Sequence, residues 1–159
     1  MSLQHANVRR AAVAGLIGTA AMTALWQAEM QLGLASFAVG DILSNLLSVV
    51  TAHTVLGPLM GWVLHFTAGI LLAVLYAAWA GPRRHVPVAW GLLYGAAIFL
   101  VAQLVFMPLV GAGLFSRGDP AMLIGSLVGH LVYGGLVGLI YGAPALPGMI
   151  DFQPRRPMA

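Results

Sequence analysis

Four apolar runs, each close to 20 residues long, constrain this chain more than any other feature of its sequence. They cover about residues 11–33, 58–80, 88–110 and 121–142. A helix needs about 20 apolar residues to cross a hydrocarbon core about 30 Å thick. Because lipid offers no hydrogen-bond partner to an open backbone, each run is expected to cross the membrane as a helix.

Charge is correspondingly scarce. Only 7% of the 159 residues are charged, whereas a soluble domain carries about 25%. Residues 1–159 are therefore expected to form a single integral membrane domain in contact with lipid. The seven basic residues are short clusters of arginine at the ends of the runs, which predicts no nucleic-acid partner. The lack of cysteine excludes disulfides, cysteine-bound iron–sulfur clusters and covalent haem attachment.

The arginine pairs predict the orientation. The pairs at 9–10, 83–84 and 155–156 all fall on one side of a four-span arrangement. The positive-inside rule then places both termini in the cytoplasm of a bacterium, with the protein in the inner membrane. On the opposite, outer side, residues 41–53 have apolar and polar faces at helical spacing, which predicts a short interfacial helix.

The runs also contain an internal repeat. The pattern H-x3-G-x6-Y occurs twice, 65 positions apart, as His65, Gly69, Tyr76 and as His130, Gly134, Tyr141. Its residues share one helix face within about 40°. The first and third runs match more weakly at an offset of 76, for example Gly15 with Gly91. We therefore expect an all-α, four-transmembrane-helix bundle built from a duplicated two-helix hairpin, with an axis along the membrane normal.

This arrangement predicts a polar layer in the outer half of the bundle. Its members are Glu29, His65, Gln103 and His130, one from each run. Ionisable side chains inside a membrane cost a few kcal/mol or more when charged, so they face the bundle and usually serve function.

We favour haem b held between His65 and His130 as the purpose of this layer. Neutral imidazole is a common axial ligand, and helical bundles build cofactor sites from facing helices. A porphyrin lying against a helix requires small residues one turn before and after its ligand. Such residues flank both histidines: Gly61, Gly69, Ser126 and Gly134. The protein would then be a subunit of a respiratory-type complex with a role in electron transport.

Two alternatives use the same residues differently. Glu29, His65 and His130 could bind a transition metal, with Gln103 supporting them by hydrogen bonds, or the layer could bind a quinone headgroup. The other alternative is a cofactor-free structural or accessory subunit that packs through its glycine-rich helix faces. In that case His65 would bond to Glu29 and His130 to Gln103. The chain has no G-x-S-x-G motif, phosphate loop or Rossmann fingerprint that would indicate an enzyme.

Three short motifs carry a family resemblance. G-x-x-G-T-A-A-M at Gly15–Met22, H-F-x-x-G at 65–69 and G-H-L-x-Y-G at 129–134 resemble a family of small, uncharacterised four-helix bacterial inner-membrane proteins. The resemblance implies the topology and no particular site. We expect other membrane subunits, or further copies of the chain, as partners.

Overall fold

The computed structural model describes residues 7–33, 56–80 and 88–142. All regular secondary structure within these residues is helical. The elements are α1 (Val8–Gln31), α3 (Leu56–Ala80), α4 (Val88–Val101), η2 (Ala102–Phe106), α5 (Met107–Leu109), η3 (Leu114–Gly118) and α6 (Pro120–Gly142). The interfacial helix expected at 41–53 lies outside the described residues.

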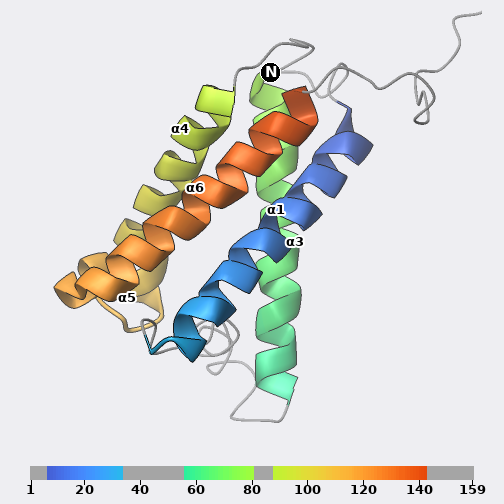
Figure 1. Cartoon of the computed structure of the whole chain (residues 1–159). Helices are drawn as coiled ribbons and strands as arrows, with labels where there is room; N and C mark the ends of the chain where they lie inside the picture. Colours follow the sequence, from blue (N-terminus) through green and yellow to red (C-terminus); the bar gives the residue numbers. More distant parts are fainter. Residues whose placement is uncertain (1–6, 34–55, 81–87, 143–159) are drawn as a thin grey trace, which may run out of the picture.

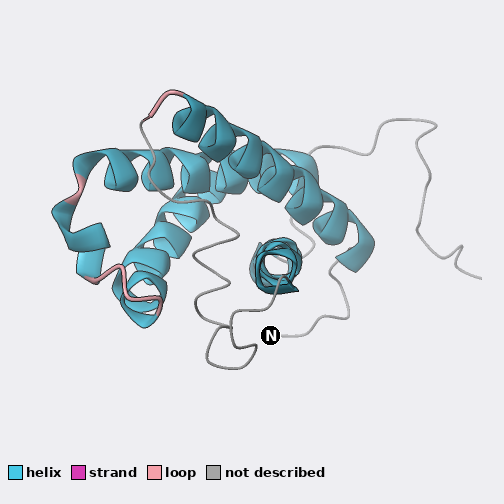
Figure 2. Ribbon diagram, turned by 90° about the horizontal axis from the view of Figure 1, so that it is seen from below, coloured by secondary structure: helices cyan, strands magenta, loops and turns pink. Residues whose placement is uncertain are grey.

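The described helices form a bundle with two distinct ends (Figure 1). We call the end near Val8 and Gly142 the terminal end, and the end near Gln31 and Pro120 the distal end. Helix α6 packs between α4 and α1, and α1 packs between α6 and α3. Figure 2, viewed from the distal end, shows α3 end-on while the other long helices run obliquely to it. Four segments of the described residues are long and apolar enough to cross a membrane: Val8–Gln31, Leu59–Ala80, Val88–Leu109 and Pro120–Gly142. The predicted all-α, four-span fold is confirmed.

Local chemistry sets where the helices begin. The Asn7 side chain accepts a hydrogen bond from the backbone N–H of Arg10 at 3.0 Å and caps α1. The Asp119 carboxylate accepts bonds from the N–H groups of Ala121 and Met122, at 3.0 and 3.3 Å, and caps α6. Pro120 follows Asp119 at the first helical position, where the absence of an N–H costs nothing.

The third span is not a uniform α-helix. Residues Ala102–Phe106 form a π-helical turn in which the N–H of Met107 donates to the carbonyl of Ala102. Pro108 explains this turn, because it has no N–H for the carbonyl four residues earlier and its ring crowds that carbonyl. The wider turn changes the direction in which Gln103 points, and such turns often occur at functional sites.

Both hairpins pack through the same small residues, which supports the predicted repeat. A methyl group added to Gly15 would lie 2.8 Å from the Ala73 side chain, so α1 and α3 are nearly in backbone contact there. The equivalent position, Gly91, contacts the backbones of Gly134 and Gly138 in the same way. Close approach of this kind is how helices associate in a membrane, where apolar burial gives them no advantage over lipid.

Candidate ligand site in the bundle interior

A chain of hydrogen bonds leads from the distal end to His130. The hydroxyl of Ser116 donates to the Gln103 carbonyl oxygen at 2.9 Å, and the Gln103 amide nitrogen donates to the Ser126 hydroxyl oxygen at 3.1 Å. All three of these residues are buried, Gln103 completely. Because the amide can both accept and donate, Gln103 joins η3 to α6 and leaves neither of its polar groups unpaired.

The same region determines how His130 is oriented. Its Nδ1 lies 2.7 Å from the backbone carbonyl of Ser126. A carbonyl only accepts, so Nδ1 carries the proton and Nε2 is left with a free lone pair. The ring also meets Phe99 of α4 edge-on, with centroids 6.1 Å apart. His130 is thus held in one tautomer, in which Nε2 can only accept a hydrogen bond.

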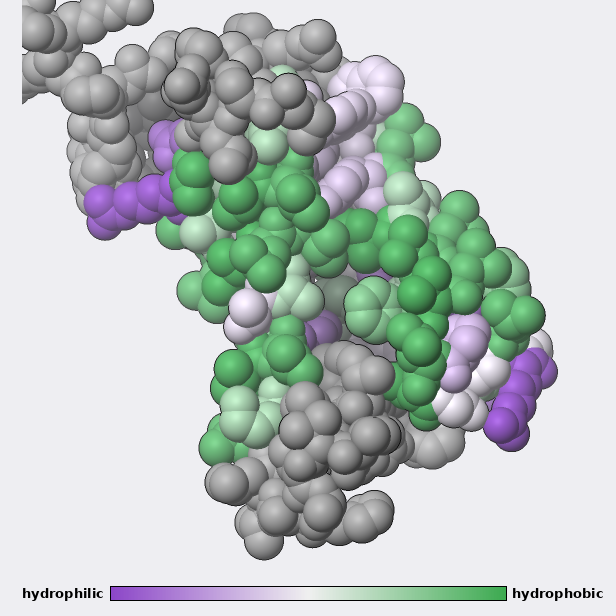
Figure 3. Space-filling view, turned by 180° about the vertical axis from the view of Figure 1, so that it is seen from behind, coloured by the Kyte–Doolittle hydropathy of each residue, from purple (hydrophilic) through white to green (hydrophobic). Residues whose placement is uncertain are grey.

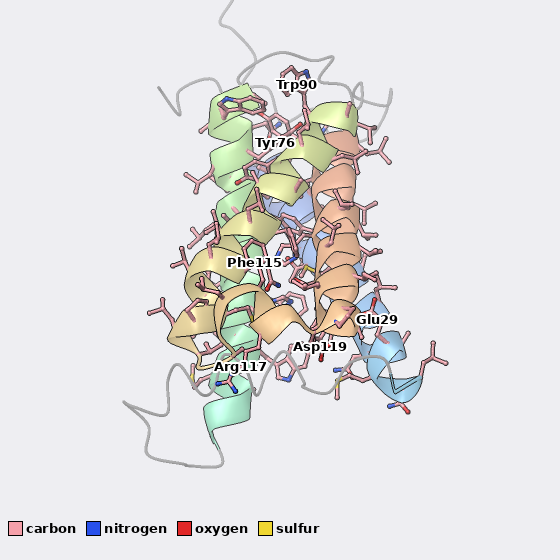
Figure 4. The ribbon with its side chains drawn as sticks, turned by 90° about the vertical axis from the view of Figure 1, so that its left-hand side faces the viewer. Glu29, Tyr76, Trp90, Phe115, Arg117 and Asp119 are labelled. Atoms are coloured by element: carbon pink, nitrogen blue, oxygen red, sulfur yellow. The ribbon has the colours of Figure 1, made fainter. Side chains whose placement is uncertain are left out.

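Ser116 reaches the bundle interior on an unusual loop. Phe115, Ser116 and Arg117 all have positive φ, between 46° and 54°. The left-handed region costs a non-glycine residue about 1–2 kcal/mol. The segment is held by Gly113 and Gly118, which adopt positive φ freely, and by the bond from Arg117 to the carbonyl of Gly111 at 3.0 Å. Figure 4 shows Arg117 and Asp119 at the distal end, with Tyr76 and Trp90 at the terminal end.

His65 has a different partner from the one expected. Its Nε2 lies 3.1 Å from the hydroxyl of Thr23 on α1, and its ring contacts Trp62 and Phe66 edge-on. Glu29 instead lies with its carboxylate against Gly125 of α6. The predicted His65–Glu29 and His130–Gln103 hydrogen bonds are therefore replaced. Thr23 bonds to His65, and Ser126 stands between Gln103 and His130.

Helices α3 and α4 are separated by an open groove of about 470 Å³. Its lining residues are Leu75 and Trp79 from α3 and Trp90, Leu93, Tyr94 and Ala97 from α4. Across this groove the helices meet mainly through long side chains. Tyr94 donates to the carbonyl of Leu72 at 2.7 Å, and the rings of Trp79 and Trp90 meet edge-on at 5.5 Å.

The internal repeat explains why this groove exists. By the two offsets, the α3–α4 pair corresponds to the α1–α6 pair, which is tightly closed. On α1 and α6 the close approach uses small residues: Gly18 contacts Tyr133, Gly125 contacts Glu29, and Gly129 contacts Met22. At the corresponding positions α4 has Tyr94, and α3 has Met60 and Leu64. At these positions α3 and α4 therefore lack the glycines through which α1 and α6 approach each other.

The space-filling view shows a hollow on the same side of the molecule. In Figure 3, seen from behind Figure 1, apolar residues surround a central hollow with hydrophilic residues on its floor. In the bilayer, an apolar rim over a polar floor suits a ligand with one polar and one apolar part.

We tested whether the residues around the histidines fit a haem. His130 fits the role of an axial ligand, because Nδ1 donates to a carbonyl and Nε2 is free. The small residues that flank the two histidines do not leave the space that a porphyrin needs. The space beside Gly69 is filled by Thr19, and the space beside Gly134 by Gly91 and Gly95. Gly61 and Ser126 are buried, and Ser126 bonds to Gln103. These residues make room for neighbouring helices, so the structure offers no slot for a porphyrin beside them.

The metal alternative gains no geometric support. The described ranges contain no group of three or more His, Cys, Asp or Glu side chains placed to hold a metal ion. The set of Glu29, His65 and His130 stays a prediction.

Sequence reasoning missed three contributors to this site. Ser116 and Thr23 are short polar residues whose contacts depend on the fold, and no spacing rule identifies them. The groove was also missed, although the repeat contained its signal. Comparing the offsets position by position would have shown tyrosine, methionine and leucine in α3 and α4 where α1 and α6 have glycine.

These features define a small multi-pass membrane protein with buried polar side chains in its interior. The chain belongs to the family of unknown function DUF6789, which matches residues 5–146. Comparison with curated proteins and with solved structures found no match.

Proposed function

We propose that this protein binds a lipid-soluble, redox-type ligand by hydrogen bonds with His65 and His130 in the interior of the bundle. The hollow with a hydrophilic floor on the α3–α4 side is the observation that carries the proposal. His65 on α3 is held by Thr23 of α1, and His130 on α6 is held by Ser126 of its own helix and contacts Phe99 of α4. A ligand between them would therefore contact both halves of the duplicated structure.

A single-ring headgroup of the quinone type suits this interior better than haem b. A quinone has carbonyl oxygens that accept hydrogen bonds, and its reduced form has hydroxyls that donate to a free Nε2 such as that of His130. A porphyrin would need the space that Thr19, Gly91 and Gly95 already occupy. We further propose a setting in the bacterial inner membrane, with cytoplasmic termini, as a subunit of a respiratory-type complex or as a homo-oligomer.

The cofactor-free accessory subunit is the competing proposal. It is supported by the hydrogen bond that each histidine makes within the chain. However, the glycine faces expected to dock a partner are used inside this molecule, between α1 and α3 and between α4 and α6. An accessory role would therefore have to use another surface.

Binding of a short-chain benzoquinol, the reduced form whose hydroxyls can donate to Nε2 of His130, to the purified protein in mild detergent tests the proposal. Losing one hydrogen bond of about 1.4 kcal/mol weakens affinity about tenfold, so His65→Ala and His130→Ala should each raise the Kd by about that factor. Thr67→Ala is the matched control, because Thr67 is exposed on α3 two residues from His65.

Three outcomes are distinguishable. Tenfold weakening in both histidine variants, with an unchanged control, supports the quinone site. A Soret band in the pure protein that is lost in both variants supports haem b. A folded, colourless protein that binds the quinol no better than its histidine variants would leave the accessory role.

A further inference from the structure

The groove between α3 and α4 has a shape that limits what it can hold. On α4 its lining extends from Trp90 to Ala97, which is about 10 Å along the helix. A transmembrane helix is itself about 10–12 Å wide and about 30 Å long, so it would need contacts along the whole bundle. A volume of about 470 Å³ lies within the range of small-ligand sites.

The lining is apolar and aromatic. Leu75, Leu93 and Ala97 supply aliphatic surface, while Trp79, Trp90 and Tyr94 supply aromatic walls. The edge-on contact of Trp79 with Trp90 joins the two helices at the terminal end, where tryptophan commonly lies at the membrane surface. Because the two tryptophans join α3 and α4 at the membrane surface, a ligand would reach the groove from the side, through the hydrocarbon of the bilayer.

The internal repeat indicates that the opening is a feature of the sequence. Trp90 and Tyr94 stand where α1 has Ala14 and Gly18. Ala14 is completely buried, and a β-carbon added to Gly18 would lie 3.0 Å from the ring of Tyr133. The same helix face is therefore small in the closed pair and large and aromatic in the open pair.

We propose that the α3–α4 groove binds the single apolar chain of a membrane amphiphile, entering sideways from the bilayer. Gly95 contacts the backbone carbonyl of His130, so Ala97, two residues further along α4, places the inner end of the groove near the level of that histidine. The inference extends the proposed function, because the groove gives the ligand of the polar layer a place for its tail. It would also hold if the headgroup were not a quinone.

Quenching of tryptophan fluorescence by 9,10-dibromostearic acid, added to the full chain in mild detergent, tests this inference. Trp26→Phe and Trp62→Phe are introduced together first, so that the emission comes from Trp79 and Trp90. A bound bromine-labelled chain should quench this emission saturably. Ala97→Phe fills the groove and should raise the half-saturating concentration about tenfold, as expected when about 1.4 kcal/mol of binding is lost.

Ala20→Phe is the control, because Ala20 is an exposed alanine on α1, away from the groove. It should leave the titration unchanged. Linear quenching that is identical in Ala97→Phe and Ala20→Phe would overturn the inference. So would a stable dimer that is lost in Ala97→Phe, because a second copy would then occupy the groove. His65→Ala with His130→Ala should leave the quenching intact, which separates this test from that of the quinone site.

Discussion

Replacing Gly134 by alanine tests the packing on which the whole bundle depends. A β-carbon at this position would lie 2.7 Å from the backbone nitrogen and Cα of Gly95, whereas ordinary contact begins at 3.4 Å. Both neighbouring atoms are backbone, so α4 and α6 must separate locally. Overpacking of this kind costs about 1–3 kcal/mol. Alanine returns about 0.5–1 kcal/mol through its better helix propensity, which leaves a net loss of up to about 2.5 kcal/mol.

Gly135→Ala is the matched control on the adjacent residue. There the new β-carbon would meet only the end of the Leu92 side chain, at 3.2 Å. That side chain can rotate away, so Gly135→Ala should be neutral or slightly stabilising. The free energy of unfolding of each variant is measured by titrating sodium dodecyl sulfate into mixed micelles. Equal stability of the two variants would refute the close α4–α6 contact.

Three further variants address the interior. Tyr133→Phe removes the hydroxyl that donates to the Gly69 carbonyl at 2.6 Å and should cost about 0.5–1.5 kcal/mol in the same titration. Tyr76→Phe should be neutral or stabilising, because among the described residues the Tyr76 hydroxyl is the only buried side-chain polar atom without a hydrogen-bond partner; a loss equal to that of Tyr133→Phe would contradict this contrast. Gln103→Leu leaves the Ser116 and Ser126 hydroxyls without their shared partner and should cost about 1–3 kcal/mol. It should also speed proteolysis of the 111–118 segment in detergent, and unchanged proteolysis would show that Gln103 does not hold that segment.

The architecture was largely predictable because membrane insertion leaves few choices. Apolar length defined the spans to within a few residues, and the caps at Asn7 and Asp119 follow ordinary helix chemistry. The π turn before Pro108 was not predicted. Proline disfavours a regular helix on its N-terminal side, and here the chain widens one turn and continues as a helix.

The candidate site was predicted only in part. His65, His130 and Gln103 are placed in the interior, but their partners are Thr23, Ser126 and Ser116. Sequence spacing gives the face of a helix and the approximate depth of a residue. It does not give the rotation of one helix against another, and that rotation decides which short polar side chain a histidine meets. For the same reason Gly69 and Gly134, read as space for a porphyrin, serve helix contacts.

The central claim is that the α1–α6 interface is closed whereas the equivalent α3–α4 interface is open. Cysteine pairs test it most directly, because the chain has no cysteine of its own. In the closed pair, the β-carbon position of Gly129 lies 3.2 Å from the Met22 side chain, so Met22→Cys with Gly129→Cys should form a disulfide in membranes on mild oxidation. The equivalent pair on α3 and α4, Leu64→Cys with Ile98→Cys, should remain reduced. Equal disulfide yields in the two pairs would contradict the open α3–α4 interface.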